Sequence, residues 1–309
     1  MKIVFMGTPD FAVPSLNALV RAGYEVVGVF CQPDRPKGRG GGLAECSVKQ
    51  AALLHGLPVV QPERIRGQAG LDALRAFAPD LCVTAAFGQI LSAKNLEVPP
   101  LGTVNVHASL LPKYRGAAPI QRAIINGETC TGVTTMYTAL GVDTGDIILQ
   151  RKTSIHPEET AGMLFERLAE LGAQTLLETI ELIKTGKAPR VPQNEAEATH
   201  CSMIQKNDGR IDFGGDAVRL RNFIRGMNPW PGAFICIDNI TLKVHEVHVV
   251  YLSGEPGTVL HADNEHGLVI ACGQNALEIT CLQAPGKRAM SAKEYLRGHP
   301  ISAGAVSAE

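Results

Sequence analysis

Short apolar runs of strand length alternate with amphipathic helical patterns in the first half of the chain, and this alternation limits the possible folds more than any other feature. Helical patterns such as 48–54 and 71–77 lie between the strand candidates, which are at 3–6, 25–31, 58–60, 80–86 and 103–107. Strands that alternate with helices are joined by parallel crossovers, which are nearly always right-handed. The pattern therefore predicts an α/β fold with a doubly wound, mostly parallel, Rossmann-like sheet.

The pattern changes near residue 187. Before it, strand candidates rich in β-branched residues lie at 132–138 and 146–155, and a long amphipathic helix ends at Gly186. Residues 188–208 contain prolines and show little periodicity, which is typical of a linker. A helix over 216–227 and five short strand candidates follow, at 234–237, 241–250, 257–260, 268–271 and 277–282. We therefore expect a first domain over 1–187, a linker over 188–208 and a small OB-like β-barrel domain over 209–309.

Composition and cysteine usage are those of an ordinary globular protein in a reducing compartment. The 309 residues are 45% hydrophobic with a net charge of −1, so the bulk charge neither favours nor excludes an anionic partner. The eight cysteines are scattered singly, without a Cys-x-x-Cys pair, as is typical of buried thiols. No apolar stretch approaches the roughly 20 residues that span a bilayer, and the N-terminal run is too short for a signal peptide. We expect a cytoplasmic location, no membrane segment and no obligate protein partner.

The strand at 103–107 carries a polar pair at its end. Successive side chains of a strand point to opposite faces, so Asn105 and His107 share one face while the valines between and before them enter the core. Leu110-Leu111-Pro112 and Gly116 end the strand and turn the chain. Ligands of open α/β sheets bind outside the carboxyl ends of strands. The stretch is therefore a candidate site.

Asn105, His107 and Asp143 are the residue types that acyl transfer without a covalent enzyme intermediate requires. Asp143 lies between two glycines, in the stretch Gly141 to Gly145, which is typical of a loop. A preplaced amide donor at a developing oxyanion lowers a barrier by roughly 2.7–4 kcal/mol. A carboxylate orients an imidazole, favours its cationic form and accepts a proton from an attacking amine. The same pattern also fits a structural histidine, and spacing alone does not bring Asp143 to His107.

Other motifs point to few alternative chemistries. Gly7-Thr8-Pro9 lacks the Gly-x-Gly-x-x-Gly of dinucleotide sites, and Ser109 lies outside a Gly-x-Ser-x-Gly elbow. The glycine-rich segment 33–42 lacks the ending of a P-loop, and its basic residues allow either a solvated linker or an arm that seeks an anion. His245 and His248 lie in a strand pattern without the helical spacing of a zinc pair. We expect no metal.

Several motifs together resemble a known family. Asn-x-His, then Ser-Leu-Leu-Pro-x-x-x-Gly and a later Asp-Thr-Gly loop, resembles the folate-dependent formyltransferases that use 10-formyltetrahydrofolate. The resemblance extends along essentially the whole chain and is narrower for those members that act on methionyl-initiator tRNA. Five stretches carry it: 7–11 (GTPDF), 32–36 (QPDRP), 115–122 (RGAAPIQR), 228–231 (NPWP) and 286–291 (GKRAMS).

The resemblance implies a role for specific residues. By it, Asn105, His107 and Asp143 are catalytic. The implied tetrahydrofolate contacts are Ser109, Leu110, Leu111, Pro112, Phe87, Gly88 and Ile90, and the implied tRNA contacts are Arg39 of the basic arm and Lys206 of the linker. Family members commonly continue the arm with a Pro-Ser-Pro-Val-Lys-like stretch, where this chain has Ala44-Glu45-Cys46-Ser47-Val48-Lys49. Both prolines are absent and a carboxylate is added, so we expect less rigidity where the arm returns.

The resemblance implies transfer of a formyl group from 10-formyltetrahydrofolate to the α-amino group of methionyl-initiator tRNA. Two alternatives remain: a formyltransferase of the same fold that acts on a small amine, such as glycinamide ribonucleotide or an amino-sugar nucleotide, and a non-catalytic tRNA-binding protein. The helix over 216–227 carries three arginines, and Lys287-Arg288 adds further positive charge. A basic second domain favours a large anionic substrate over a small one.

Overall fold

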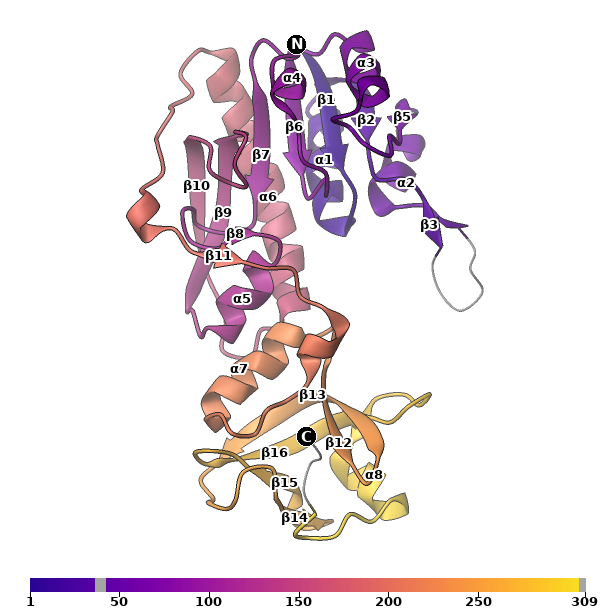
Figure 1. Cartoon of the computed structure of the whole chain (residues 1–309), viewed down its shortest axis with the longest axis vertical. Coiled ribbons are helices and arrows are strands. Elements are labelled where there is room, and N and C mark those ends of the chain that lie inside the picture. The colour runs from indigo at the N-terminus through magenta and orange to yellow at the C-terminus, as the bar shows by residue number, and fades with distance from the viewer. Residues whose placement is uncertain (37–42, 306–309) are drawn as a thin grey trace. The chain divides into compact units, whose positions relative to one another are not determined.

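The computed structural model describes residues 1–36 and 43–305, which form two compact units (Figure 1). The first unit comprises Met1–Gly116, Cys130–Ser154 and Phe165–Cys201, and the second comprises Ala117–Thr129, Ile155–Leu164 and Ser202–Glu309. Each unit thus takes segments from more than one part of the sequence. The expected boundaries at 187 and 209 stay a prediction.

A seven-stranded sheet forms the centre of the first unit. Its strands are β1 (Lys2–Gly7), β2 (Glu25–Phe30), β5 (Val59–Val60), β6 (Leu81–Ala85), β7 (Thr103–His107), β9 (Cys130–Tyr137) and β10 (Ile147–Ser154). They lie in the order β10-β9-β7-β6-β1-β2-β5, with parallel pairing from β5 to β7 and antiparallel pairing of β9 to both its neighbours. From β1 the chain adds β2 and β5 on one side of the sheet, and it then adds β6, β7, β9 and β10 on the other side. The point at which the strand order reverses therefore lies between β1 and β6. The predicted doubly wound, mostly parallel sheet is confirmed.

Helices lie against the sheet of the first unit, and Figure 1 labels α1 (Val13–Arg21), α2 (Ser47–Leu54), α3 (Gln68–Ala76), α4 (Ala93–Leu96) and α6 (Ala161–Lys184), most of which belongs to this unit. The unit also contains two short 3-10 helices, η1 (Asp10–Ala12) and η2 (Glu195–Glu197). Gly172 of α6 packs so closely on β7 that an added Cβ would lie 2.9 Å from Val106 Cγ1. Because α6 covers the Val106 face of β7, Asn105 and His107 project from the other face.

Two short ladders complete the first unit. β3 (Arg35–Pro36) pairs antiparallel with β4 (Leu43–Ala44), at the base of the predicted arm. β8 (Arg115–Gly116) pairs parallel with β11 (His200–Cys201), so the chain after the long helix returns to the segment that follows β7. This pairing brings residues of the expected linker beside the strand end that carries the candidate site.

The second unit packs helices on an antiparallel sheet. Its strands are β12 (Ala233–Ile237), β13 (Ile240–Val250), β14 (Val259–Asp263), β15 (Gly267–Ala271), β16 (Ala276–Gln283) and β17 (Met290–Ser291), and its helices include α5 (Pro119–Ile125), η3 (Lys206–Gly209), α7 (Ala217–Met227) and α8 (Ala292–Gly298). The sheet order is β12-β13-β16-β15-β14, with β17 beside β16. The antiparallel β domain is confirmed. Within the described residues β12 and β14 do not pair, so the ladder is open.

The cysteines are free thiols, and Cys31, Cys82, Cys201 and Cys272 are buried. Burial raises the pKa of the Cys82 thiol to about 12, so this side chain remains protonated and packs as a small hydrophobic group. Among the described helices, none combines the length and apolar character needed to cross a membrane.

Candidate active site

The site is built on the last residues of β7. Asn105 is half-buried and His107 is buried, while Val104 and Val106 lie in the core. Asp143 lies in the loop between β9 and β10, at a φ of 54°. Its carboxylate oxygen Oδ2 is 3.5 Å from His107 Nδ1, and Asn105 Nδ2 donates to Oδ1 at 3.4 Å. The structure therefore brings the three predicted residues together, although 36 to 38 positions separate Asp143 from the other two.

Neighbouring groups fix how these side chains are oriented. Thr84 Oγ1 on β6 donates to Asn105 Oδ1 at 2.8 Å, so the amide nitrogen faces Asp143. Gly116 N donates to Asp143 Oδ2 at 2.9 Å. His107 Nε2 lies 2.9 Å from the carbonyl oxygen of Tyr114, which only accepts, so Nε2 carries the proton. Both ring nitrogens thus face acceptors, and only the cationic imidazole supplies a donor to each.

A buried arginine, absent from the predicted site residues, holds the loop that carries Asp143. Arg115 is 1% exposed. Its guanidinium donates to both carboxylate oxygens of Glu195 at 2.7 and 2.8 Å and, through Nε, to Gln193 Oε1 at 3.0 Å. Gln193 Nε2 in turn donates to the carbonyl oxygens of Asp143 and Gly145, both at 2.8 Å. The hydrogen bonds from Arg115 through Gln193 therefore hold the backbone from Asp143 to Gly145 in place.

This arginine also makes folding sensitive to acid. The bond to Arg115 lowers the pKa of the Glu195 carboxyl below its ordinary value. A carboxyl whose folded pKa is depressed stabilises the fold above its unfolded pKa, and that contribution is lost as pH falls through the folded pKa. We expect Glu195→Gln to lose this acid-dependent part of the free energy of unfolding, measured by urea titrations from neutral pH to below the ordinary glutamate range. The exposed Glu170→Gln on α6 is the matched control, and an unchanged pH slope in Glu195→Gln would contradict the expectation.

The residues expected along the folate form a tightly bonded turn after β7. Ser109 is buried, its Oγ donates to the Lys113 carbonyl at 2.6 Å, and its own carbonyl accepts from Thr134 Oγ1 at 2.7 Å. The buried Leu111 donates its N–H to the same hydroxyl at 3.1 Å. Leu110 and Pro112 are half-buried. Ser109 and Leu111 therefore shape the turn, and the accessible side-chain surface belongs to Leu110 and Pro112.

The second group of expected folate contacts lies in the loop after β6. Thr8 Oγ1, just beyond β1, donates to the carbonyl of the buried Phe87 at 2.9 Å. Gln32 Nε2 donates to the carbonyl of Gly88, which has a φ of 79°, at 2.8 Å. Ile90 is 62% exposed. The loop thus lies at the carboxyl ends of β1 and β6, where the sheet reverses and where ligands of such sheets bind.

Of the two residues expected to contact tRNA, the structure describes Lys206. Arg39 lies outside the described residues. Lys206 is exposed at the start of η3 in the second unit. Arg221 and Arg225 of the basic helix α7 contact their own unit, through Glu158 and the carbonyl of Glu159 respectively. Arg219 is exposed and carries no side-chain bond recorded in the part of the chain that the structure describes.

Arg219 also lines a cavity of about 470 Å³ that lies entirely within the second unit. The lining residues are Ile125, Asn126, Arg210, Asp212, Gly215, Arg219, Leu220, Asn222 and Phe223. The cavity thus combines guanidinium and amide groups with an aromatic ring. Such groups bind phosphates and nucleotide bases.

Comparisons with known proteins match the whole chain. The family model described as formyl transferase covers residues 1–180, and the model of the formyl transferase C-terminal domain covers residues 203–300. The methionyl-tRNA formyltransferase of Moorella thermoacetica is 49% identical over 308 residues, which are 99% of each chain. That of Geotalea daltonii is 46% identical over 305 residues, 99% of this chain and 97% of the relative.

Solved structures of lower identity share the fold. An N-formyltransferase from Helicobacter canadensis, in complex with folinic acid and dTDP-3-aminofucose, superposes with a TM-score of 0.67 at 20% identity and covers 90% of this chain and 99% of its own. HypX from Aquifex aeolicus, in complex with tetrahydrofolic acid, gives 0.64 at 18% identity over 96% of this chain and 47% of its own. With both family models matched and near-complete relatives approaching half identity, the chain belongs to the formyl transferase family.

Proposed function

We propose that the protein transfers the formyl group of 10-formyltetrahydrofolate to the α-amino group of methionyl-initiator tRNA, in the cytoplasm. The observation that carries this proposal is the convergence of Asn105, His107 and Asp143 at the carboxyl end of β7. It occurs in a chain that is 46% to 49% identical, along its length, to proteins named methionyl-tRNA formyltransferase.

The residues at the carboxyl ends of β6 and β7 fit a folate co-substrate. The folate supplies a formyl carbon to be attacked by an amine. The exposed Ile90 offers apolar surface to a flat ring at the loop after β6, and the Thr8 and Gln32 bonds hold that loop in shape. Pro112 and Leu110 extend the accessible surface after β7. These two segments follow β6 and β7, the paired strands that carry Thr84 and the polar residues Asn105 and His107.

Asn105 stabilises charge on the formyl oxygen. When an amine adds to a carbonyl carbon, negative charge collects on oxygen, and a fixed donor there lowers the barrier. Thr84 donates a hydrogen bond to Oδ1 of Asn105, so the amide presents its N–H groups to a bound substrate. One N–H faces Asp143, and the other has no partner recorded in residues 1–36 or 43–305. That second N–H is the oxyanion donor in our proposal.

His107 and Asp143 complete the proton and charge balance. The Nε2 proton of His107 is donated to the Tyr114 carbonyl, and its Nδ1 faces the Asp143 carboxylate, so in our proposal His107 holds Asp143 in place and donates to the oxyanion only after the Nε2 bond to Tyr114 is broken. Asp143, or a water molecule that it binds, takes the proton that the attacking amine loses. The amine loses this proton as its nitrogen bonds to the formyl carbon, and the bond to the folate nitrogen then breaks as that nitrogen takes up the proton held by Asp143 or its water molecule. No metal is required for these steps.

One assay separates the proposal from its alternatives. The full chain is incubated with 10-formyltetrahydrofolate and, in turn, charged initiator tRNA, uncharged initiator tRNA, glycinamide ribonucleotide and an amino-sugar nucleotide, and the formylated product is measured. We expect product with charged initiator tRNA alone. Product with a small amine in place of the tRNA would assign the chain to another formyltransferase, and salt-sensitive tRNA binding without product would indicate a non-catalytic role.

Arg219 should contribute to binding of the tRNA. We expect Arg219→Ala to raise KM for charged initiator tRNA by about tenfold, the equivalent of roughly 1.4 kcal/mol, with little change in kcat. Because one phosphate contact is lost, the slope of log K against log salt should fall by about one. The measurement is tRNA binding at several salt concentrations. Arg75→Ala, an exposed arginine of α3 in the first unit, is the control, and equal effects in the two variants would argue against a specific contact.

A further inference from the structure

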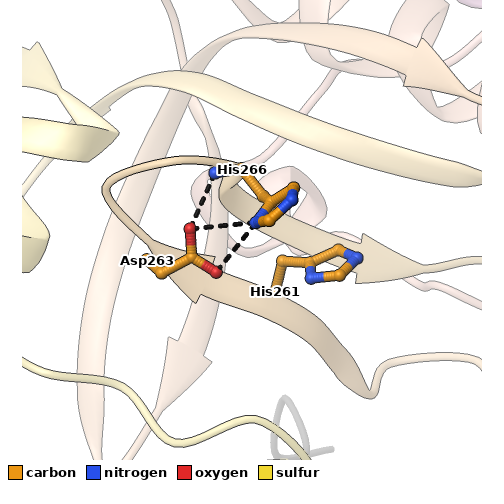
Figure 2. Close-up of side chains that lie close together, drawn as sticks. All are labelled: His261, Asp263 and His266. Carbon is orange, nitrogen blue, oxygen red and sulfur yellow. Dashed lines mark hydrogen bonds and ion pairs between the residues drawn. The ribbon is translucent and has the colours of Figure 1, made fainter.

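Three potential metal ligands gather on the β14–β15 hairpin of the second unit (Figure 2). They are His261 and Asp263 of β14 and His266 in the turn that follows. Each offers one ligand atom, and these atoms all lie within 4.8 Å of one another. His261 and Asp263 are two positions apart on a strand and so share a face. The sequence His-x-Asp-x-x-His was not recognised from spacing, because its third member reaches the site only through the turn.

The turn itself fixes two of the three ligands. Asp263 Oδ1 accepts the backbone N–H groups of Glu265 at 2.8 Å and His266 at 2.7 Å, which holds the carboxylate over the turn. His266 Nδ1 lies 3.1 and 3.2 Å from the two carboxylate oxygens. Figure 2 shows this imidazole nitrogen pointing at Asp263, with the His261 ring beside it. The two rings are stacked, with centroids 4.7 Å apart and an interplanar angle of 25°.

We propose that His261, Asp263 and His266 bind a divalent transition-metal ion of the zinc class. Zinc lies about 2.0–2.2 Å from nitrogen and oxygen ligands, so the pair His266 and Asp263 is already near ligand spacing. His261 completes the set by a rotation of its side chain toward the carboxylate. Two imidazoles with one carboxylate favour zinc, nickel or copper ions, whereas calcium and magnesium prefer oxygen ligands alone. The remaining coordination positions are open to water.

This site is distinct from the groups proposed for formyl transfer. Its residues belong to the second unit, whereas Asn105, His107 and Asp143 belong to the first. One positive and one negative side chain lie beside the hairpin turn. Lys293 Nζ donates to the Glu265 carbonyl at 2.9 Å, and the Glu278 carboxylate lies near Gly267 at the start of β15. A bound ion would join the end of β14 to the turn and would stabilise the hairpin. The proposal rests on this geometry and not on the proposed activity.

Cobalt and zinc titrations test the site on the full chain after treatment with a chelator. Bound Co²⁺ is followed by its visible absorption, which also reports whether thiolates take part, and Zn²⁺ binding is followed by calorimetry. We expect one ion per chain, bound with a dissociation constant in the micromolar range and without thiolate charge-transfer bands. His261→Ala and His266→Ala should each weaken binding by at least about tenfold. His248→Ala, an exposed histidine on β13, should bind as the unsubstituted protein does.

Asp263→Asn separates ligation from the structure of the turn. The asparagine keeps an oxygen for the backbone N–H groups of Glu265 and His266 but loses the negative charge. We expect weaker Zn²⁺ binding with an unchanged melting temperature of the metal-free protein. Formyl transfer should be unaffected by any of the three substitutions. Binding only at millimolar Zn²⁺, or equal binding by the His261 and His266 variants and the unsubstituted protein, would overturn the proposal.

Discussion

Replacement of Asn105 by alanine should lower kcat for formyl transfer by about 10²- to 10³-fold, the usual effect of losing one oxyanion donor. The expected loss lies in kcat because the second amide N–H acts on charge that develops only during the reaction. Folding should be little affected, since the Thr84 hydroxyl also lies 3.3 Å from the Val104 carbonyl and can donate there. The measurement is steady-state kinetics with charged initiator tRNA, together with urea unfolding.

Two further variants make this prediction specific. Asn17→Ala removes an amide of α1 that contacts His55, at the surface of the same unit, and should leave kcat unchanged. Asp143→Asn keeps the size of the side chain but removes the charge that faces His107, so its pH–rate profile should change as well as its kcat. If Asn105→Ala retained near-normal kcat while remaining folded, the assignment of Asn105 as the oxyanion donor would be wrong.

The fold was predictable because its elements are local. The strands β1, β2 and β6 are short, mostly apolar runs, and helical patterns lie between them, whereas β7 alternates apolar and polar residues. Right-handed crossovers then leave few arrangements for such a chain. The antiparallel sheet of the second unit followed from short strands with polar turns. Closure into a barrel depends on pairing between its first and last strands, which local patterns do not specify.

The catalytic candidates were predictable as residue types, but their contacts were not. The alternation in β7 placed Asn105 and His107 on one face, whereas the approach of Asp143 depends on the antiparallel pairing of β9 with β7. The role of Arg115 was missed because its partner Glu195 lies 80 positions along the chain, in a stretch that looked like a linker. A buried arginine needs a partner, but the sequence did not indicate that Arg115 is buried.

Arg115→Ala should lower the free energy of unfolding by about 2–5 kcal/mol and should also reduce kcat. The first effect arises because a large buried side chain is lost and Gln193 Oε1 loses its donor, whereas Glu195, with 72% of its side chain exposed, regains water. The second arises because Gln193 then no longer holds the Asp143 loop in place. Both effects are measurable, by urea unfolding and by steady-state kinetics below the unfolding temperature of the variant.

Gln193→Ala and Arg115→Lys separate stability from positioning. Gln193→Ala leaves the pair of Arg115 and Glu195 intact but removes both donors to the carbonyls of Asp143 and Gly145. Its kcat should therefore fall more, relative to its loss of stability, than that of Arg115→Ala. Arg115→Lys keeps the charge but cannot make the two parallel bonds to Glu195 and the third to Gln193, so it should restore little activity. Because a purely structural arginine would predict normal kcat in folded Gln193→Ala, that single measurement decides whether Arg115 acts through Gln193 on the acidic loop.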